Sequence, residues 1–353
     1  MILRRFACLL LALPLFSPCA ARSQKPLPTV RSGAKSIHLD VVVDTKSGQP
    51  VTNLTRKDFV ILDNKSPRPI TSFKVMTPAQ EPVEVVFLLD AVNIPYQMVA
   101  YARQGLIKFL RAGDAKLAYP TSLAVLTDNG VMIAKGFSTD GNALSNSLAH
   151  YSIGLREINR TAQWGGLQRL QICVNSLQEL DAYAARLPGR KLLLWISPGW
   201  PLISGPQVYL DAMEERETFN QAVALSTSLR KDSVTLYDVN PIGANESLLF
   251  ADYYQDFLSG ATSPGNVQLA ALSLQVLSAQ SGGLVFESEN DIPGMIRRCL
   301  LDAQSWYAIR FDPPPADKPN QFHQITVKLD RPGLIVRTRN GYYSNPRTIG
   351  SRR

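Results

Sequence analysis

Histidine, cysteine and the common catalytic motifs are scarce or missing in this sequence. The 353 residues include only three His and four Cys. His38 and His323 lie in predicted β segments and His150 ends a predicted helix, so no pairing of a nucleophile with a histidine base can be argued. The patterns Gly-x-Ser-x-Gly, Gly-x-Gly-x-x-Gly and Gly-x-x-x-x-Gly-Lys-Ser/Thr do not occur. The best-known signatures of hydrolases, dinucleotide-binding proteins and P-loop NTPases are therefore excluded.

Long apolar runs and internal repeats are also absent. Beyond the amino terminus no apolar run reaches about 18 residues, so we expect no membrane-spanning helix in the mature chain. No repeat with a period of 20–50 residues is present. Apolar residues make up 45% and charged residues 19% of the chain, which is typical of a globular protein and not of a disordered one.

The amino terminus has the three parts of a bacterial secretory signal. Arg4 and Arg5 precede an apolar stretch at 6–16, and small residues follow at 20–23. We therefore expect an exported protein, located in the periplasm, in the cell envelope or outside the cell. Lipidation at Cys19 is the alternative form of this signal.

Cleavage of the signal changes both the charge and the cysteine count. The net charge falls from +8 to +5, with the remaining positive charge concentrated near the carboxyl terminus. That basic tail is either solvated or in peripheral contact with an anionic envelope surface. Without aromatic residues among the basic ones, nucleic acid is not an expected partner. Cys173 and Cys299 then remain, either as a disulfide or as buried small residues of predicted helices.

The middle of the chain alternates buried strands with amphipathic helices. Residues 83–89 and 191–196 are almost continuously apolar, as in strands that are covered on both faces. Asp128-Asn129-Gly130 predicts a hairpin. The alternation predicts an α/β fold, with a Rossmann-like, mainly parallel central sheet and helices on both faces. We expect the 83–90 strand at the centre of this sheet and the 121–137 hairpin at one edge.

Both ends of the globular part are predicted to form strands. Residues 37–43 and 306–311 alternate apolar and polar side chains. Neither end can bury its apolar face alone, so we expect one small discontinuous all-β sandwich of six strands, with the α/β domain inserted in it. The predicted divisions are a signal peptide at 1–23, a linker at 24–35, the β-sandwich at 36–80 plus 304–343, the α/β domain at 81–303 and a basic tail at 344–353.

The two predicted β segments at the ends of the globular part also contain short sequence motifs. The first segment contains Ser47-Gly-Gln-Pro50 and Leu54-Thr-Arg-Lys-Asp-Phe59. The second contains Tyr307, Arg331-Pro-Gly-Leu334 and Gly341-Tyr-Tyr343. With the alternating centre, the chain resembles the von Willebrand factor type A (VWFA)-related domain proteins of acidobacterial type, over about residues 36–343. The resemblance implies a type A domain and indicates the fold more than the function.

Type A domains usually bind a divalent cation at a metal-ion-dependent adhesion site. Its ligands are an Asp-x-Ser-x-Ser motif after the first strand, a Thr, and an Asp after a later strand. Asp90 keeps the first position here, but Val92 and Ile94 replace the two Ser residues. Ser197 and Pro198 stand where the later Asp is expected. The resemblance therefore implies a degenerate site and no required cofactor.

Few oxygen ligands remain for such a site. Asp90, Asn93 and Thr161 are the candidate metal-binding residues, and Asp128 is a further substitute. One carboxylate with neutral oxygens binds Mg²⁺ weakly. In the other interpretation, Asp90 caps the next helix or accepts hydrogen bonds from loop amides. We then expect divalent cations to leave thermal stability unchanged, and Asp90→Ala to cost about 1 kcal/mol.

Two long loops, at 198–208 and 240–266, follow predicted strands and are the expected location of function. They contain several aromatic residues but few of the neighbouring pairs of acidic residues that acid–base catalysis would need. The aromatic residues of this region are Trp200, Tyr209, Phe250, Tyr253, Tyr254 and Phe257. This favours a non-enzymatic protein that binds a protein partner of unknown identity through the sheet rim. The alternatives are an envelope hydrolase with its site in these loops, or a scaffold of a surface or secretion assembly.

Overall fold

The structure is a computed structural model that describes residues 36–150, 163–201, 203, 210–243, 253–286 and 289–346. The predicted signal peptide, the linker, Thr161 and most of the basic tail lie outside these residues. None of the helices that the structure describes is both long and apolar enough to cross a membrane.

A seven-stranded, mainly parallel sheet forms the centre of the α/β part, in the order β11-β10-β9-β5-β6-β7. The short β8 also pairs with β6. The strands are β5 (Val83–Asp90), β6 (Lys116–Thr127), β7 (Gly130–Ile133), β8 (Ser138–Asp140), β9 (Arg190–Ile196), β10 (Val234–Val239) and β11 (Val285–Phe286). The expectation of β5 inside the sheet and the β6–β7 hairpin at an edge is confirmed.

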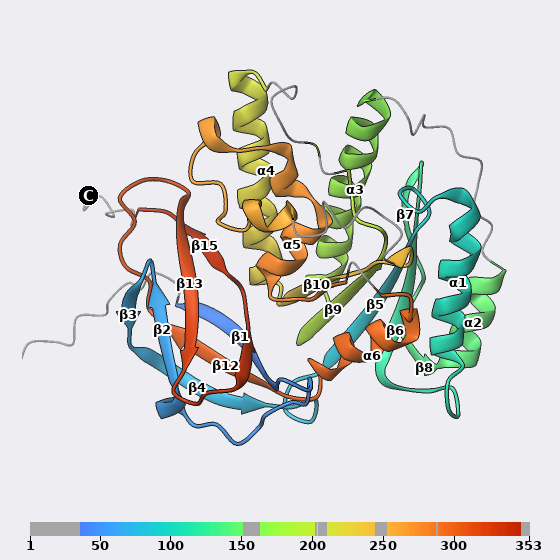
Figure 1. Cartoon of the computed structure of the whole chain (residues 1–353), viewed down its shortest axis with the longest axis horizontal. Coiled ribbons are helices and arrows are strands. Elements are labelled where there is room, and N and C mark those ends of the chain that lie inside the picture. Colours follow the sequence, from blue (N-terminus) through green and yellow to red (C-terminus); the bar gives the residue numbers. More distant parts are fainter. Residues whose placement is uncertain are drawn as a thin grey trace, which may run out of the picture. The chain divides into compact units, whose positions relative to one another are not determined.

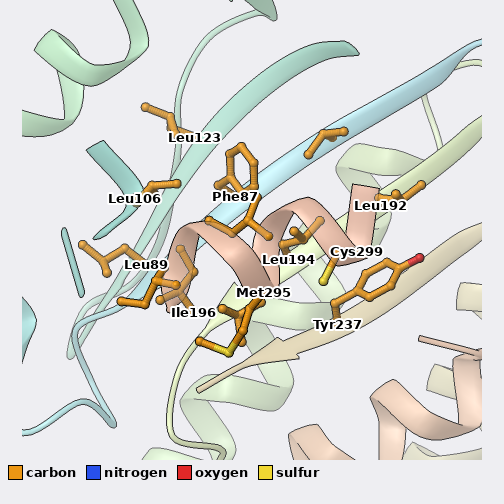
Figure 2. Close-up of a cluster of buried hydrophobic side chains, with 14 of the residues drawn as sticks. Phe87, Leu89, Leu106, Leu123, Leu192, Leu194, Ile196, Tyr237, Met295 and Cys299 are labelled. Atoms are coloured by element: carbon orange, nitrogen blue, oxygen red, sulfur yellow. The ribbon is translucent and has the colours of Figure 1, made fainter. Parts of the chain in front are cut away.

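Helices cover both faces of this sheet, as the apolar strands predicted (Figure 1). On one face lie α1 (Tyr96–Leu110), α2 (Gly141–Ala149) and α6 (Ile292–Leu301). On the other lie α3 (Gln163–Ala184), α4 (Ala212–Lys231) and α5 (Leu274–Ser281). Figure 2 shows the first of these two cores, in which Phe87, Leu194 and Met295 pack together. The α/β part is therefore a three-layer structure.

The two ends of the described chain form a sandwich of two four-stranded antiparallel sheets. Their orders are β14-β1-β12-β4 and β15-β13-β2-β3. The strands are β1 (Ile37–Thr45), β2 (Phe59–Asp63), β3 (Ser66–Arg68), β4 (Ile70–Met76), β12 (Trp306–Phe311), β13 (Gln321–Leu329), β14 (Leu334–Arg337) and β15 (Gly341–Ser344). The expected count of six strands was too low. The short β3, which contains Pro67, has no alternation by which it could be recognised.

The α/β part is inserted between two neighbouring strands of one sandwich sheet. The chain leaves the sandwich after β4 and returns in β12, and these strands pair antiparallel with Trp306 opposite Met76. Each sandwich sheet contains strands from both ends of the chain. The predicted fold class, a Rossmann-like α/β structure inserted in a discontinuous all-β sandwich, is therefore confirmed.

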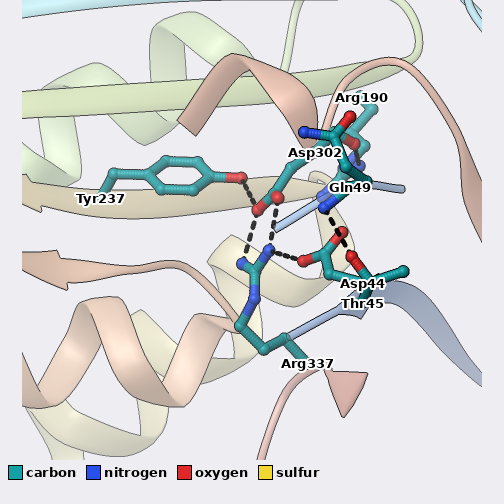
Figure 3. Close-up of polar contacts among 7 residues, drawn as sticks. All are labelled: Asp44, Thr45, Gln49, Arg190, Tyr237, Asp302 and Arg337. Carbon is teal, nitrogen blue, oxygen red and sulfur yellow. Dashed lines mark hydrogen bonds and ion pairs between the residues drawn. The ribbon is translucent and has the colours of Figure 1, made fainter. Parts of the chain in front are cut away.

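A buried charged network joins the sandwich to the α/β part (Figure 3). Both Arg337 Nη atoms donate to the Asp302 carboxylate, at 2.7 and 2.5 Å, and one also donates to Asp44 at 2.8 Å. The Tyr237 hydroxyl donates to the same Asp302 carboxylate at 2.8 Å. Burial alone would lower the pKa of Arg337, but the two carboxylates raise it. Burial raises the pKa of Asp44, and Arg337 opposes this shift.

The motifs of the end segments have structural roles in the sandwich. The Tyr307 hydroxyl donates to the Val51 carbonyl oxygen at 2.7 Å and accepts from the Leu54 amide at 3.1 Å. Arg331 donates from Nε to Asp58 Oδ1 at 2.9 Å. These bonds join residues that lie over 250 positions apart in the sequence, so the motifs have a structural role in the folding of the sandwich.

Candidate functional site

The carboxyl ends of the parallel strands meet at one edge of the central sheet, where folds of this class place binding residues. Asp90 ends β5, Ser197 follows β9 and Asn240 follows β10. All three side chains are buried. Of the candidate metal ligands Asp90, Asn93 and Thr161, only Asp90 has a charged side chain.

Five donors from the chain surround the Asp90 carboxylate. Oδ1 accepts from the backbone amides of Val92 at 2.9 Å and Asn93 at 2.8 Å. Oδ2 accepts from Asn93 Nδ2 at 2.8 Å, Trp195 Nε1 at 3.0 Å and Ser197 Oγ at 2.8 Å. A carboxylate offers about four lone-pair sites, so these donors fill its acceptor capacity. The carboxylate has no exposed surface.

The other positions of the motif also face away from a cation. Val92 packs in the core on one face of the sheet and Ile94 in the core on the other face, both without exposed surface. Asn93 turns its amide nitrogen, not its oxygen, toward Asp90. Asp128 lies in the turn between β6 and β7. The described residues contain no group of three or more His, Cys, Asp or Glu that could hold a metal ion.

The two cysteines of the α/β part are separate free thiols. Cys173 of α3 accepts a hydrogen bond from Asn93 Nδ2 at 3.1 Å, while Cys299 of α6 packs on the opposite face of the sheet. Burial, with the nearby Asp90 carboxylate, raises the pKa of the Cys173 thiol. Burial raises that of Cys299 as well, with a contribution from Asp302. A thiol with a raised pKa is a poor nucleophile at neutral pH.

The expected aromatic rim differs from the structure in one respect. Trp200 is only 3% exposed and packs edge-on against Trp195, with ring centroids 4.9 Å apart. The expectation that Trp200 is available for binding was therefore wrong. Tyr253, Tyr254 and Phe257 are half-buried. Tyr209 and Phe250 lie outside the described residues, as do 202, 204–208 and 244–249 of the two long loops.

Two other residues supply exposed apolar surface at this edge. Tyr96 is 72% exposed and Met213 is 73% exposed. Tyr96 begins α1 after β5, and Met213 lies in the first turn of α4 after β9. Because both helices follow strands that end at the carboxyl edge, their amino termini lie there. Sequence reasoning missed both residues, because neither lies in the loops at 198–208 and 240–266 where function was expected.

A second buried polar group, which the sequence analysis missed, lies inside the sandwich. Asp63 accepts from His323 Nδ1 at 2.8 Å and from the Tyr342 hydroxyl at 2.6 Å. The His323 and Tyr342 rings stack with centroids 4.9 Å apart. Since none of the three is more than 2% exposed, no substrate reaches them. The group connects β2, β13 and β15 and has a structural role.

Comparison with known proteins gave structural similarities only. No family model and no curated protein matches the chain. An aerotolerance-related membrane protein from Bacteroides fragilis is 12% identical, with 62% of this chain and 97% of that chain covered and a TM-score of 0.33. The manganese-loaded TRAP protein of Plasmodium vivax is 10% identical, with 76% and 96% covered and a TM-score of 0.33.

A pilus adhesin, SpaC from Lactobacillus rhamnosus GG in its open conformation, is also similar. It is 10% identical, with 85% of this chain and 48% of that chain covered and a TM-score of 0.32. Similarities of this size carry no argument about function. The fold assignment rests on the strand order and pairing of the chain itself.

Proposed function

We propose that this chain is an exported, non-enzymatic protein that binds a protein partner through the carboxyl edge of its central sheet. The observation that carries the proposal is the placement of Tyr96 and Met213. They are the two most exposed large apolar side chains of the described residues, and both begin helices at this edge. Exposed aromatic residues and Met are enriched at protein interfaces. The signal-like segment at 1–23 supports export.

The Asp90 environment supports binding that does not depend on a metal. A divalent cation at this position would have to displace protein donors from a carboxylate that already accepts five hydrogen bonds. The Val92 and Ile94 side chains, which pack in the cores on the two faces of the sheet, would supply none of the hydroxyl oxygens that the cation needs. The residues present therefore do not fit a divalent cation, and the adhesion site implied by the family resemblance is degenerate.

Site-specific photo-crosslinking tests where the partner binds. A photoreactive amino acid replaces Tyr96 or Met213 at the edge, and Val60 or Ile335 in the sandwich as controls. The two controls are also exposed, at 43% and 46%. In cells that make the protein at its native level, we expect one crosslinked partner from both edge positions and none from the control positions. Equal crosslinking at all four positions, or none at the edge, would contradict the proposal.

A further inference from the structure

Charge is unevenly distributed along the chain. The protein has 37 Lys and Arg against 29 Asp and Glu, yet residues 232–296 contain no Lys, Arg or His and eight Asp and Glu. This acidic segment begins before β10 and ends within α6. A surface built from it has no positive charge of its own to neutralise the acids.

Only some of these acids are available at the surface. Glu289 pairs with Arg298 and Asp291 with Arg297, which follow just after the segment. Asp238 is buried in β10. Asp256 is exposed, and it forms no ion pair with any residue that the structure describes. Among the acids of this segment that the structure describes, Asp256 is therefore the one that is exposed and has no ion-pair partner among the described residues.

Asp256 lines a hollow of about 320 Å³ in the loop between β10 and α5. The 3₁₀ turn Tyr253–Phe257 supplies this carboxylate together with two aromatic rings. The Tyr253 and Phe257 rings meet at 82° with centroids 5.3 Å apart, and so form a corner. The other lining residues are Ser259, Gly260, Ala261, Asn266, Val267, Gln268 and Ala271. None of the lining residues is cationic.

The hollow adjoins the exposed start of α4. Gly265 lies in the 3₁₀ turn Pro264–Asn266, and a Cβ at that position would lie 4.0 Å from Glu215 Oε2 of α4. Glu215 and Met213 both lie in the first turn of α4 but, being two residues apart, point to different sides of the helix, so the hollow lies beside the turn that carries Met213. A partner that covers Met213 is therefore close to the hollow.

The carboxylate and the two aromatic rings of the hollow favour a positively charged ligand. Aromatic faces attract Lys and Arg through the ring quadrupole, and a nearby carboxylate adds direct charge attraction. Phosphate or carboxylate ligands would find no cationic side chain in the lining. The volume is at the lower limit for ligand pockets, about 300 Å³, and therefore suits one side chain better than a large molecule.

We propose that this hollow receives a Lys or Arg side chain of the partner protein. The proposal rests on the proposed function, because it names the chemistry of the partner that binds at the adjoining edge. Asp256 provides the counter-charge, Phe257 and Tyr253 provide the aromatic corner, and Glu215 extends the acidic surface toward α4.

Fluorescence anisotropy with labelled hexalysine and hexaserine tests the proposal on the full mature chain. We expect hexalysine, and not hexaserine, to bind the unaltered protein. Asp256→Asn should weaken hexalysine binding by about fivefold or more, and Phe257→Leu by a few-fold, through loss of the cation–aromatic contact. The matched control is Asp114→Asn, an exposed carboxylate between α1 and β6 at the opposite edge of the sheet. It makes the same change in net charge and should alter binding by less than twofold.

Two results of the anisotropy experiment would overturn the proposal. One is the absence of hexalysine binding by the unaltered protein. The other is an equal loss in Asp256→Asn and Asp114→Asn, which would indicate general attraction to a charged surface. Melting curves of each variant confirm that it is folded. If the crosslinks from the edge positions persist unchanged in Asp256→Asn, the cationic contact is rejected and the proposed function is left intact. If the protein without the Asp256 substitution gives no crosslinks from the edge positions, the proposed function itself is rejected.

Discussion

At the residue scale, the role of Asp90 in the structure differs from the role that the family resemblance implies. The resemblance makes it a metal ligand, but its donors come from the loop after β5, from Trp195 of β9 and from Ser197, which follows β9. Ser197 stands where the resemblance expects a second carboxylate, and its hydroxyl donates to Asp90. At the position where the resemblance implies a metal ligand, Ser197 instead donates a hydrogen bond to Asp90.

Asp90→Ala should destabilise the protein by about 3–5 kcal/mol, because it leaves several buried donors without an acceptor. This is larger than the cost of about 1 kcal/mol expected for one local hydrogen bond. Asp90→Asn should cost less, since its carbonyl oxygen can keep some of the donors. Urea denaturation of both variants measures these differences.

The same denaturation series with and without Mg²⁺, Mn²⁺ and Ca²⁺ provides the metal test. We expect no change at about millimolar concentrations. A bound ion at 100 times its dissociation constant would stabilise the protein by about 2.7 kcal/mol. A stabilisation of that size that Asp90→Ala abolishes would show that the site binds metal.

At the element scale, local capping decided helix boundaries that periodicity alone placed wrongly. Apolar side chains recur at helical spacing from Val267 onward, but α5 begins only at Leu274. The Ser273 side chain accepts from the Val276 amide and starts the helix there. Val267 and Ala271, which fit the helical spacing, instead pack against Phe219 and Tyr343. These apolar residues are buried as the pattern predicted, but they lie in the segment before α5 and not in the helix.

The start of α4 offers a clear test at this scale. Asp211 Oδ1 accepts from the Met213 and Glu214 amides, and Glu214 accepts from the Asp211 amide. Asp211→Ala removes this N-cap and should cost about 1 kcal/mol. Glu217→Ala, on the same helix but outside the cap, should change stability by less than about 0.5 kcal/mol. Equal thermal stability of the two variants would contradict the role of the cap.

At the scale of the whole molecule, the short segment around β14 and β15 holds the inserted α/β part against the sandwich. Arg337 bonds to Asp302 at the end of α6, and Arg339 donates to the carbonyl oxygens of Leu229 and Val234. Burial lowers the pKa of Arg339 to about 10, and no carboxylate forms an ion pair with it among the described residues. The Leu229 carbonyl lies at the carboxyl end of α4, where the helix dipole favours a positive charge.

Arg337→Ala should destabilise the protein by about 3 kcal/mol or more, because Asp302 would keep a buried charge without its partner. The loss should affect the sandwich and the α/β part together, since the network lies between them. Arg331→Ala is the matched control, because its ion pair with Asp58 is exposed and its loss should be much smaller. Calorimetry distinguishes the two variants, and equal melting temperatures would contradict the role of Arg337.

The layers of the molecule could be predicted from the spacing of apolar residues alone. Almost continuous apolar runs such as 83–89 and 191–196 predicted the buried central strands, and alternation at 37–43 and 306–311 predicted half-buried strands. These predictions succeeded because the spacing of apolar side chains along the chain directly reports which faces of a strand or helix are buried. The secretory signal and the domain divisions stay predictions.

The partners of the buried polar groups, in contrast, depend on the tertiary fold. Asp90 with Trp195 and Ser197, Asp63 with His323, and Arg337 with Asp44 and Asp302 each join residues that are far apart in sequence. No local pattern reports such pairs, because a buried hydrogen bond depends on the distance and direction between two side chains brought together by the fold. For the same reason, the exposure of Met213 and the burial of Trp200 became known only when neighbouring elements were in place.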